Sequence, residues 1–234
     1  MAEEIRERLT RVRAQIARAA ERTGRSATDI TLIAVSKTFD AETVQRAVDA
    51  GALDLGENRV QEAATKVGAV KAAELRWHLI GHLQSNKVRQ AALMFDVIHT
   101  IDSRELVDRL DRLAGELHRR PSVLVQVDLA QEPTKSGAPE SELPAIVESL
   151  DAASHLDFRG LMTLPPFFDS AESTRSYFRR LREILEGLNR SRSSERKLTE
   201  LSMGMSHDFE VAIEEGATMI RVGTAIFGAR EKRV

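Results

Sequence analysis

Cysteine is absent from the 234-residue chain, and aromatic residues make up only 4% of it, with a single tryptophan and a single tyrosine. The lack of cysteine excludes disulfides, thiolate metal sites and cysteine nucleophiles, and it is compatible with a reducing cytosol. No apolar run reaches the roughly 18 residues that a membrane span needs. We therefore expect a cytoplasmic protein without a membrane partner.

The chain also lacks an excess of charge of one sign. It carries 34 lysine and arginine residues against 36 aspartate and glutamate residues, for a formal net charge of −2. A protein that binds DNA or RNA usually has a basic excess or a basic face, so we expect no nucleic-acid partner. The hydrophobic content of 42% is ordinary for a globular protein, and a chain of this length can bury one substantial core.

The N-terminal segment is charged throughout and contains no apolar stretch of signal-peptide length. Its arginines allow a mitochondrial presequence as the alternative, but the acidic residues interspersed with them disfavour that interpretation. Apolar residues recur at steps of three and four, which predicts an amphipathic helix. These residues are Ile5, Leu9, Val12, Ile16 and Ala20.

After this helix, eight short apolar segments alternate with amphipathic segments. Such a pattern is typical of parallel strands covered by helices, and eight repeats without a larger break predict a closed (β/α)8 barrel, also called a TIM barrel, in a single domain over residues 1–234. An open doubly wound sheet is the competing architecture. The predicted strands are Thr31–Ser36, Leu53–Gly56, Trp77–Gly81, Val97–Ile101, Ser122–Asp128, Phe158–Thr163, Leu198–Met203 and Met219–Gly223. The predicted helices between them cover 41–50, 58–73, 83–93, 103–118, 140–153, 171–190 and 207–216.

Functional residues of such barrels lie at the C-terminal ends of the strands. Lys37 directly follows the first apolar strand. Partial burial at that position would favour the neutral amine over the ammonium, and a neutral amine is what Schiff-base formation with an aldehyde requires. The structural alternative is a lysine that extends from the strand end to solvent or contacts an anion.

Two glycine-containing segments, SMGMS at 202–206 and RVGT at 221–224, follow the seventh and eighth predicted strands. Loops after these two strands often bind phosphate in this fold, together with the N-terminus of a short extra helix. The glycines let the backbone approach phosphate oxygens, and Ser206 and Thr224 add hydroxyl donors. Tight turns in which glycine has only a geometric role are the alternative.

Arg221 stands at the end of the eighth predicted strand and is expected to point into the barrel. It can face a carboxylate or a ring nitrogen of a ligand there. Opposite a pyridine nitrogen it would keep the ring unprotonated, which makes the ring a weaker electron sink. Pairing with a barrel acid, Asp128 or Glu57, is the alternative.

The remaining candidates come from the second, third and fourth strand ends. Asn58 can cap the following helix or hydrogen-bond a ring hydroxyl. Strand alternation favours a buried, hydrogen-bonded His78 over a catalytic one. A zinc site formed by His78, His82 and His99 is not favoured, because the segment lacks HExxH spacing and a flanking carboxylate.

Four blocks of the sequence together resemble the pyridoxal phosphate homeostasis proteins, which are similar to the N-terminal barrel domain of alanine racemase, the fold type III of pyridoxal 5′-phosphate (PLP) enzymes. The match runs nearly end to end, and the blocks keep the expected order. One departure is His207, where the family most often has alanine. The blocks are SKTF around Lys37, LGENRVQE at 55–62, WHLIGHLQSNK at 77–87 and LSMGMSHDFEVAIEEGATMIRVGTAIFG at 201–228.

The resemblance implies PLP as the cofactor, held by Lys37 as a Schiff base. It further implies that Arg221 faces the pyridine nitrogen. The implied phosphate ligands are Ser206 and the backbone of Gly223 and Thr224. The implied neighbours of the ring are Asn58, His82 and Met203.

Alanine racemase uses a second base, a tyrosine supplied by an additional C-terminal β domain. This sequence ends at Val234, after the eighth unit, and its single tyrosine, Tyr177, falls in a predicted helix. We therefore expect one base of a two-base racemisation to be missing. The resemblance then implies intracellular PLP homeostasis, in which the protein sequesters the cofactor and delivers it to apo-enzymes, without robust catalysis. Without the β domain the usual racemase dimer interface is lost, so we expect a monomer.

Two other functions are compatible with the same residues. The first is a racemase-like PLP enzyme that acts on an amino acid through one base, with Lys37 itself as that base. The second is a barrel enzyme acting on a phosphosugar or another phosphate metabolite, which would use the phosphate loops and need no Schiff base. Visible absorbance from a Schiff base separates the phosphosugar enzyme from the PLP proteins.

Overall fold

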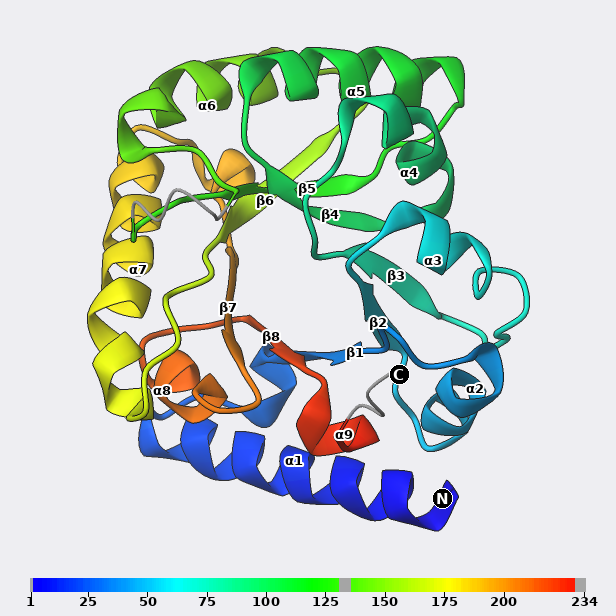
Figure 1. The fold of residues 1–234 in the computed structure, drawn as a ribbon. Helices are drawn as coiled ribbons and strands as arrows, with labels where there is room; N and C mark the ends of the chain where they lie inside the picture. Colours follow the sequence, from blue (N-terminus) through cyan, green and yellow to red (C-terminus); the bar gives the residue numbers. More distant parts are fainter. Residues whose placement is uncertain (1, 131–135, 230–234) are drawn as a thin grey trace.

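The computed structural model describes residues 2–130 and 136–229; residues 1, 131–135 and 230–234 lie outside the described part. Eight parallel strands form a closed barrel in chain order, with β8 paired to β1, and helices surround it (Figure 1). The closed ring confirms the predicted (β/α)8 barrel and contradicts the open sheet. Within residues 2–130 and 136–229, no helix has both the length and the apolarity that crossing a membrane requires.

The strands are β1 (Thr31–Val35), β2 (Asp54–Glu57), β3 (Arg76–Leu79), β4 (Val97–Ile101), β5 (Ser122–Gln126), β6 (Asp157–Met162), β7 (Glu200–Met205) and β8 (Met219–Val222). The α-helices are α1 (Ala2–Arg22), α2 (Ala41–Asp49), α3 (Val60–Ala64), α4 (Val88–Met94), α5 (Arg104–Glu116), α6 (Leu143–Ala152), α7 (Arg175–Asn189), α8 (Phe209–Glu214) and α9 (Thr224–Phe227). Short 3-10 helices cover Ala27–Asp29, Ser85–Lys87, Glu140–Glu142, Ala171–Thr174 and Ser194–Arg196.

Two hydrophobic clusters follow from the alternation of side chains along the strands. In β1, for example, Ile33 belongs to a small cluster inside the barrel, while its neighbour Ala34 belongs to a large cluster shared with the helices. The inner cluster consists of Ile33, Val97, Leu124, Met162 and Met219. Polar side chains share the interior with these few apolar ones, as described below.

The predicted N-terminal helix is present as α1, and each of its periodic apolar residues is buried, with an exposure of 4% or less. This stripe packs against α2, α8 and α9, so α1 lies along one side of the barrel (Figure 1). At its end, Arg22 forms ion pairs with Glu210 and Glu214 of α8. The helix is therefore an integral part of the outer layer.

One predicted helix is wrong in its extent. The segment 58–73 contains only the five-residue helix α3. The chain leaves the helical path soon after it, because Gly68 adopts a φ of 96° and Lys66 turns inward to bond the carboxylate of Glu57 and the carbonyl of Ser36. Tertiary contacts of one lysine thus override the local helical pattern.

Glu215 directly follows α8 and forms ion pairs with three arginines of α7. Its side chain is 6% exposed and lies 3.0 Å from Arg175, 3.1 Å from Arg179 and 3.3 Å from Arg182. Burial tends to raise the pKa of Glu215, but the three guanidinium groups outweigh it and hold the pKa below its ordinary value. The stabilisation is therefore fully present above the unfolded-state pKa of about 4.3 and is lost as the pH falls through the folded-state pKa.

We expect Glu215→Gln to lower the free energy of unfolding by about 1–3 kcal/mol at pH 7, because it removes charge-assisted hydrogen bonds. Urea unfolding measured at pH 7 and at pH 3.5 should show that the variant loses less stability on acidification than wild type. Glu186→Gln is the control. It removes the charge of a largely exposed carboxylate that pairs with Arg182, so the free energy of unfolding should change little. Equal acid sensitivity in wild type and Glu215→Gln would contradict the prediction.

Candidate cofactor site

Lys37 lies at the C-terminal end of β1, where the sequence places it. Ser36 is fully buried, and Lys37 itself is half-buried. The next residue, Thr38, has a φ of 74°, a left-handed conformation that few residues other than glycine adopt. Conformations of this kind persist only where the surroundings hold them. The turn that carries Lys37 must therefore be fixed from outside.

Three charged side chains hold this turn, and we call Lys66, Glu57 and Glu62 the Lys66 cluster. Lys66 Nζ donates to the carbonyl of Ser36 at 2.8 Å and to Glu57 Oε1 at 2.7 Å. The Ser36 hydroxyl donates to the same Glu57 oxygen at 2.6 Å. Glu62 pairs with Lys66 at 3.1 Å and accepts from the N–H of Thr38. The residues on both sides of Lys37 are thus bonded to one cluster.

Two members of the Lys66 cluster are almost completely removed from water, since Lys66 is 2% exposed and Glu57 is 0% exposed, whereas the side chain of Glu62 is 26% exposed. Burial raises the pKa of Glu57, against the opposing effects of Lys66 and Ser36. Burial also tends to raise the pKa of Glu62, but the Thr38 N–H and Lys66 outweigh it and lower the pKa. Glu57 Oε2 is the only fully buried side-chain oxygen or nitrogen without a hydrogen-bond partner among the described residues.

The loops after β7 and β8 meet beside the end of β1. Ser206 Oγ accepts a hydrogen bond from the N–H of Gly223 at 3.2 Å. A Cβ at Gly223 would lie 3.4 Å from the carbonyl oxygen of Val35, so the β8 loop contacts the strand that leads to Lys37. Thr224 begins α9, and the first N–H groups of a helix have no acceptor within it. The structure therefore brings Ser206, Gly223 and Thr224 together near Lys37.

Arg221 points into the barrel, as strand alternation predicts, and is 3% exposed. Its Nη1 donates to Ser202 Oγ at 2.6 Å, and its Nη2 donates to the carbonyl oxygen of Thr163 at 2.9 Å. Burial lowers the pKa of Arg221 to about 10, while the charge of Asp208 acts in the opposite direction. The guanidinium therefore remains charged at neutral pH. The alternative partner Glu57 is bonded to Lys66 instead.

Asn58, His82 and Met203 occupy three different environments. Asn58 is half-buried after β2, and its backbone lies so close to Gly81 that a Cβ there would approach the Asn58 carbonyl oxygen to 2.2 Å. The side chain of His82 is 51% exposed and lies 3.4 Å from Asp102. Met203 is fully buried in the large cluster that joins strands to helices, so the structure does not bring its side chain together with Arg221 inside the barrel.

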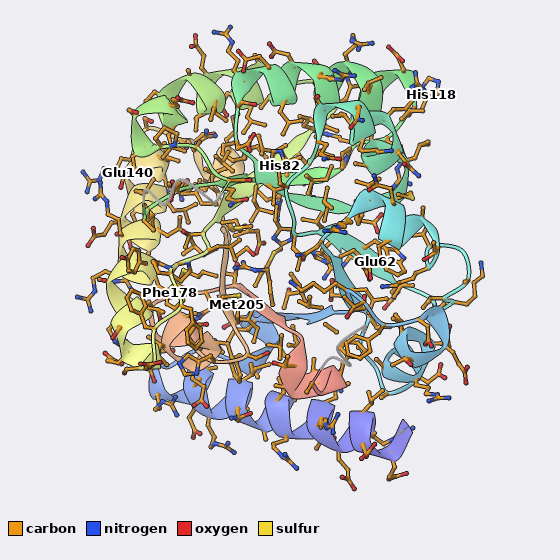
Figure 2. All side chains as sticks on the ribbon, viewed as in Figure 1. Glu62, His82, His118, Glu140, Phe178 and Met205 are labelled. Atoms are coloured by element: carbon orange, nitrogen blue, oxygen red, sulfur yellow. The ribbon has the colours of Figure 1, made fainter. Side chains whose placement is uncertain are left out.

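The three histidines considered for zinc are also separated. His78 and His99 bond to each other inside the barrel, whereas His82 is at the surface. In the view of Figure 2, His82 and Met205 lie over the barrel, within the outline of the helices, and Glu140 lies at the outer edge; His82 is exposed there. Among residues 2–130 and 136–229, no group of three metal-ligating side chains forms.

The fold and the strand-end site define a (β/α)8 barrel with a lysine after the first strand and paired loops after the last two. The family model of the alanine racemase N-terminal domain matches residues 8–231. The chain belongs to this family. An alanine racemase of Clostridium difficile 630, 17% identical with a TM-score of 0.70, shares the barrel, and the match covers 97% of this chain and 57% of the racemase chain.

Other relatives are more similar and match over almost their whole length. The pyridoxal phosphate homeostasis protein of Aquifex aeolicus is 41% identical over 225 residues, which are 96% of this chain and 98% of the relative. The protein of the same name from Escherichia coli K12 is 40% identical, with 97% of each chain covered. The structure of PipY from Synechococcus elongatus PCC7942 with PLP bound is 41% identical with a TM-score of 0.85, and covers 96% of this chain and all of its own.

Proposed function

We propose that this protein binds PLP as a Schiff base on Lys37 and serves intracellular PLP homeostasis, sequestering the cofactor and delivering it to PLP-dependent apo-enzymes. The observation that carries the proposal is the joint placement of a half-buried lysine and the loops after β7 and β8 beside the end of β1. We propose a cytoplasmic monomer with one PLP-binding domain over residues 1–234 and no nucleic-acid partner, in line with the balanced charge.

The residues present fit this cofactor at both of its ends. The Lys37 amine condenses with the aldehyde carbon, so a C=N bond forms and one water molecule leaves. Ser206 and the backbone of Gly223 and Thr224 hold the phosphate. Arg221, a pure donor, faces the pyridine nitrogen and keeps it unprotonated. Bound PLP supplies an electron sink, and an unprotonated ring weakens that sink.

We assign Asn58, His82 and Met203 to the surroundings of the ring with different support. Asn58 and His82 stand in the loops at the ends of β2 and β3, on the same end of the barrel as Lys37. Met203 can contribute only through its backbone or through packing, because its side chain belongs to the cluster outside the strands. These three contacts remain predictions.

Holding the cofactor is favoured over catalysis by the position of the single tyrosine. Tyr177 lies on α7, where its ring packs 5.9 Å from that of Phe168. It therefore belongs to the outer helical layer and does not supply a base opposite Lys37. A racemase-like enzyme that uses Lys37 as its one base is the alternative, and it differs from the proposal in turning over amino acids.

Spectroscopy and an amino-acid assay test the proposal together. PLP added to the cofactor-free protein should produce visible absorbance, and borohydride should bleach it while fixing one label on Lys37, identified by peptide mass mapping. Incubation of the loaded protein with L- or D-alanine should leave the enantiomer unchanged. Rapid interconversion would establish the racemase-like alternative, and absence of visible absorbance would favour a phosphate-metabolite enzyme.

A further inference from the structure

A continuous chain of polar side chains crosses the barrel interior from β2 to β8. Asp54 Oδ1 lies 2.8 Å from His78 Nε2, and His78 Nδ1 lies 2.9 Å from His99 Nε2. His99 Nδ1 lies 2.9 Å from Ser202 Oγ, which accepts from Arg221 Nη1 at 2.6 Å. The two histidines and the serine are 0% exposed. We call these five residues the polar chain.

The direction of every hydrogen bond in the polar chain follows from its two ends. Arginine can only donate, so Ser202 Oγ is the acceptor there and its own hydrogen is left for His99 Nδ1. His99 then carries its proton on Nε2 and donates to His78 Nδ1. His78 in turn carries its proton on Nε2 and donates to the carboxylate of Asp54, which can only accept. Four donors meet four acceptors, with both histidines neutral.

The opposite arrangement has a protonated His78. It would donate from Nδ1 to His99, which would donate from Nδ1 to Ser202, so the serine would accept twice and its hydrogen would have no place in the polar chain. It would also add a second cation to an interior that already contains Arg221. Burial lowers the pKa of His99 well below its usual range, a charged His78 would lower it further, and the charge of Arg221 acts in the same direction, so His99 is neutral in either arrangement.

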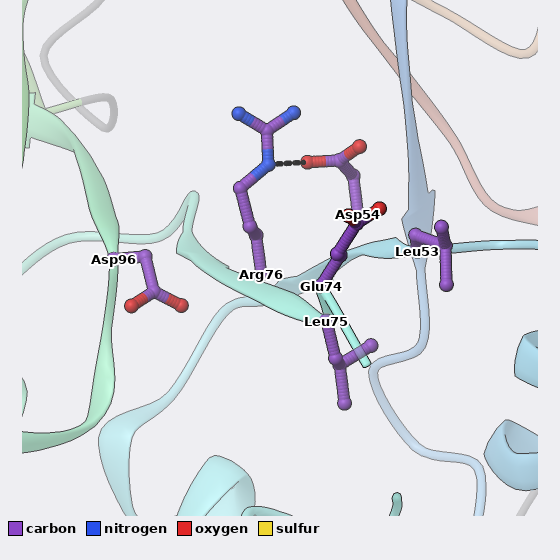
Figure 3. Close-up of a pocket in the computed structure, with 6 residues that line it drawn as sticks. All are labelled: Leu53, Asp54, Glu74, Leu75, Arg76 and Asp96. Carbon is purple, nitrogen blue, oxygen red and sulfur yellow. Dashed lines mark ion pairs between the residues drawn. The ribbon is translucent and has the colours of Figure 1, made fainter. Parts of the chain in front are cut away.

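Asp54 stands at the far end of the barrel from Lys37. It begins β2 and lines a pocket of about 420 Å³ at the N-terminal ends of the strands, where it pairs with Arg76 Nε at 2.8 Å (Figure 3). Burial of Asp54 tends to raise its pKa, but the hydrogen bond of His78 and the charge of Arg76 outweigh it, and the pKa is lowered. The other residues that line the pocket are Leu53, Glu74, Leu75 and Asp96.

We propose that Asp54 is a positioning residue for the cofactor ring: it fixes the tautomers of His78 and His99, which directs the Ser202 hydroxyl hydrogen to His99 and so orients the oxygen that accepts from Arg221. The part of this inference that concerns the ring rests on the proposed function. The proton arrangement does not, because it is a property of the cofactor-free protein. A carboxylate that fixes the tautomer of a histidine and acts through it on a third group is established chemistry, here extended over two histidines.

Nitrogen-15 NMR of the histidine rings in the cofactor-free protein tests the proton arrangement. In wild type, His78 and His99 should both be protonated on Nε2 alone. Asp54→Asn should abolish this single pattern, because an amide can donate to His78 as well as accept. Glu74→Gln removes a charge from the same pocket without touching the polar chain, and Arg76→Gln removes the ion pair but leaves the bond to His78. Both controls should keep the wild-type pattern.

A proton on His99 Nδ1 in wild type, or an unchanged pattern in Asp54→Asn, would overturn the inference.

The effect of Asp54 on the cofactor ring is tested by titrating the variants with PLP. Asp54→Asn should weaken PLP binding roughly 2- to 30-fold, the usual range for a coupled distant residue, and alter the pH dependence of the visible absorbance, whereas Glu74→Gln should do neither.

Ser202→Ala breaks the polar chain next to Arg221 without changing a charge. Ser202→Ala should also weaken PLP binding. It provides an independent measurement if thermal unfolding shows that Asp54→Asn is poorly folded. Normal PLP binding by both variants would overturn the positioning role. Failure of wild type to bind PLP would refute the proposed function, while the NMR result would still decide the proton arrangement.

Discussion

Replacing Lys37 with alanine is expected to remove all of the visible absorbance that PLP produces with the wild-type protein, because the variant lacks the amine that forms the C=N bond. PLP should still bind through its phosphate, since Ser206, Gly223 and Thr224 are unchanged. We expect an affinity about 100-fold lower, or roughly 2.7 kcal/mol. Absorbance titration gives the first quantity, and equilibrium dialysis of PLP gives the second.

The control is Lys197→Ala, which removes an exposed lysine from the segment before β7 and should leave both measurements unchanged. Lys66 is not expected to replace Lys37, because its ammonium is buried and shared by two carboxylates. An unchanged spectrum in Lys37→Ala would therefore contradict the assignment of the Schiff base. Complete loss of PLP binding would instead show that the Schiff base contributes more than about 100-fold to the affinity and the phosphate contacts less than we assign to them.

The sequence predicts the barrel well because the signal is local. Apolar runs separated by amphipathic segments identify all eight strands, and β4 is predicted with its observed bounds. The failure at 58–73 has a non-local cause: Lys66 bonds to residues 9 and 30 positions earlier in the chain. A periodicity argument cannot detect these contacts, so it extends the helix through them and misses the cluster that fixes the turn of Lys37.

The candidate site likewise combines contacts that the sequence predicts with contacts that only the folded barrel creates. Lys37, Ser206 and Gly223 follow strands, so their meeting beside β1 is predictable once the barrel is assumed. The link between His99 and Ser202 joins residues 103 positions apart, and only the closed barrel brings them together. The matching motif predicts Met203 near the ring, whereas strand alternation places its side chain on the opposite face from Ser202.

Lys66→Met is expected to cause the largest loss of stability among the variants considered. The substitution keeps an apolar stem of similar size but leaves the fully buried Glu57 without its counter-charge. Removing one partner of a buried ion pair typically costs about 3–5 kcal/mol. Urea unfolding at pH 7 measures this loss, and Lys197→Met at an exposed position is the control, with an expected change below about 0.5 kcal/mol.

The pH dependence of Lys66→Met distinguishes a lost charge from lost packing. Without Lys66, the pKa of Glu57 should rise further, because burial already raises it. The folded variant then binds a proton at a pH where an unfolded glutamate, with a pKa near 4.3, does not. Its stability should therefore increase relative to wild type as the pH falls from 7 toward 5. A deficit that stays constant over this range would indicate lost packing instead.

The same substitution should weaken PLP binding even where the protein remains folded. Lys66 bonds the carbonyl of Ser36 and orients Glu62, which accepts from Thr38, so its loss frees the residues on both sides of Lys37. The double variant Lys66→Met with Glu57→Gln removes the uncompensated charge but does not restore the bond to Ser36. It should recover stability without recovering PLP affinity. Recovery of both would show that the cluster acts on Lys37 only through the stability of the fold.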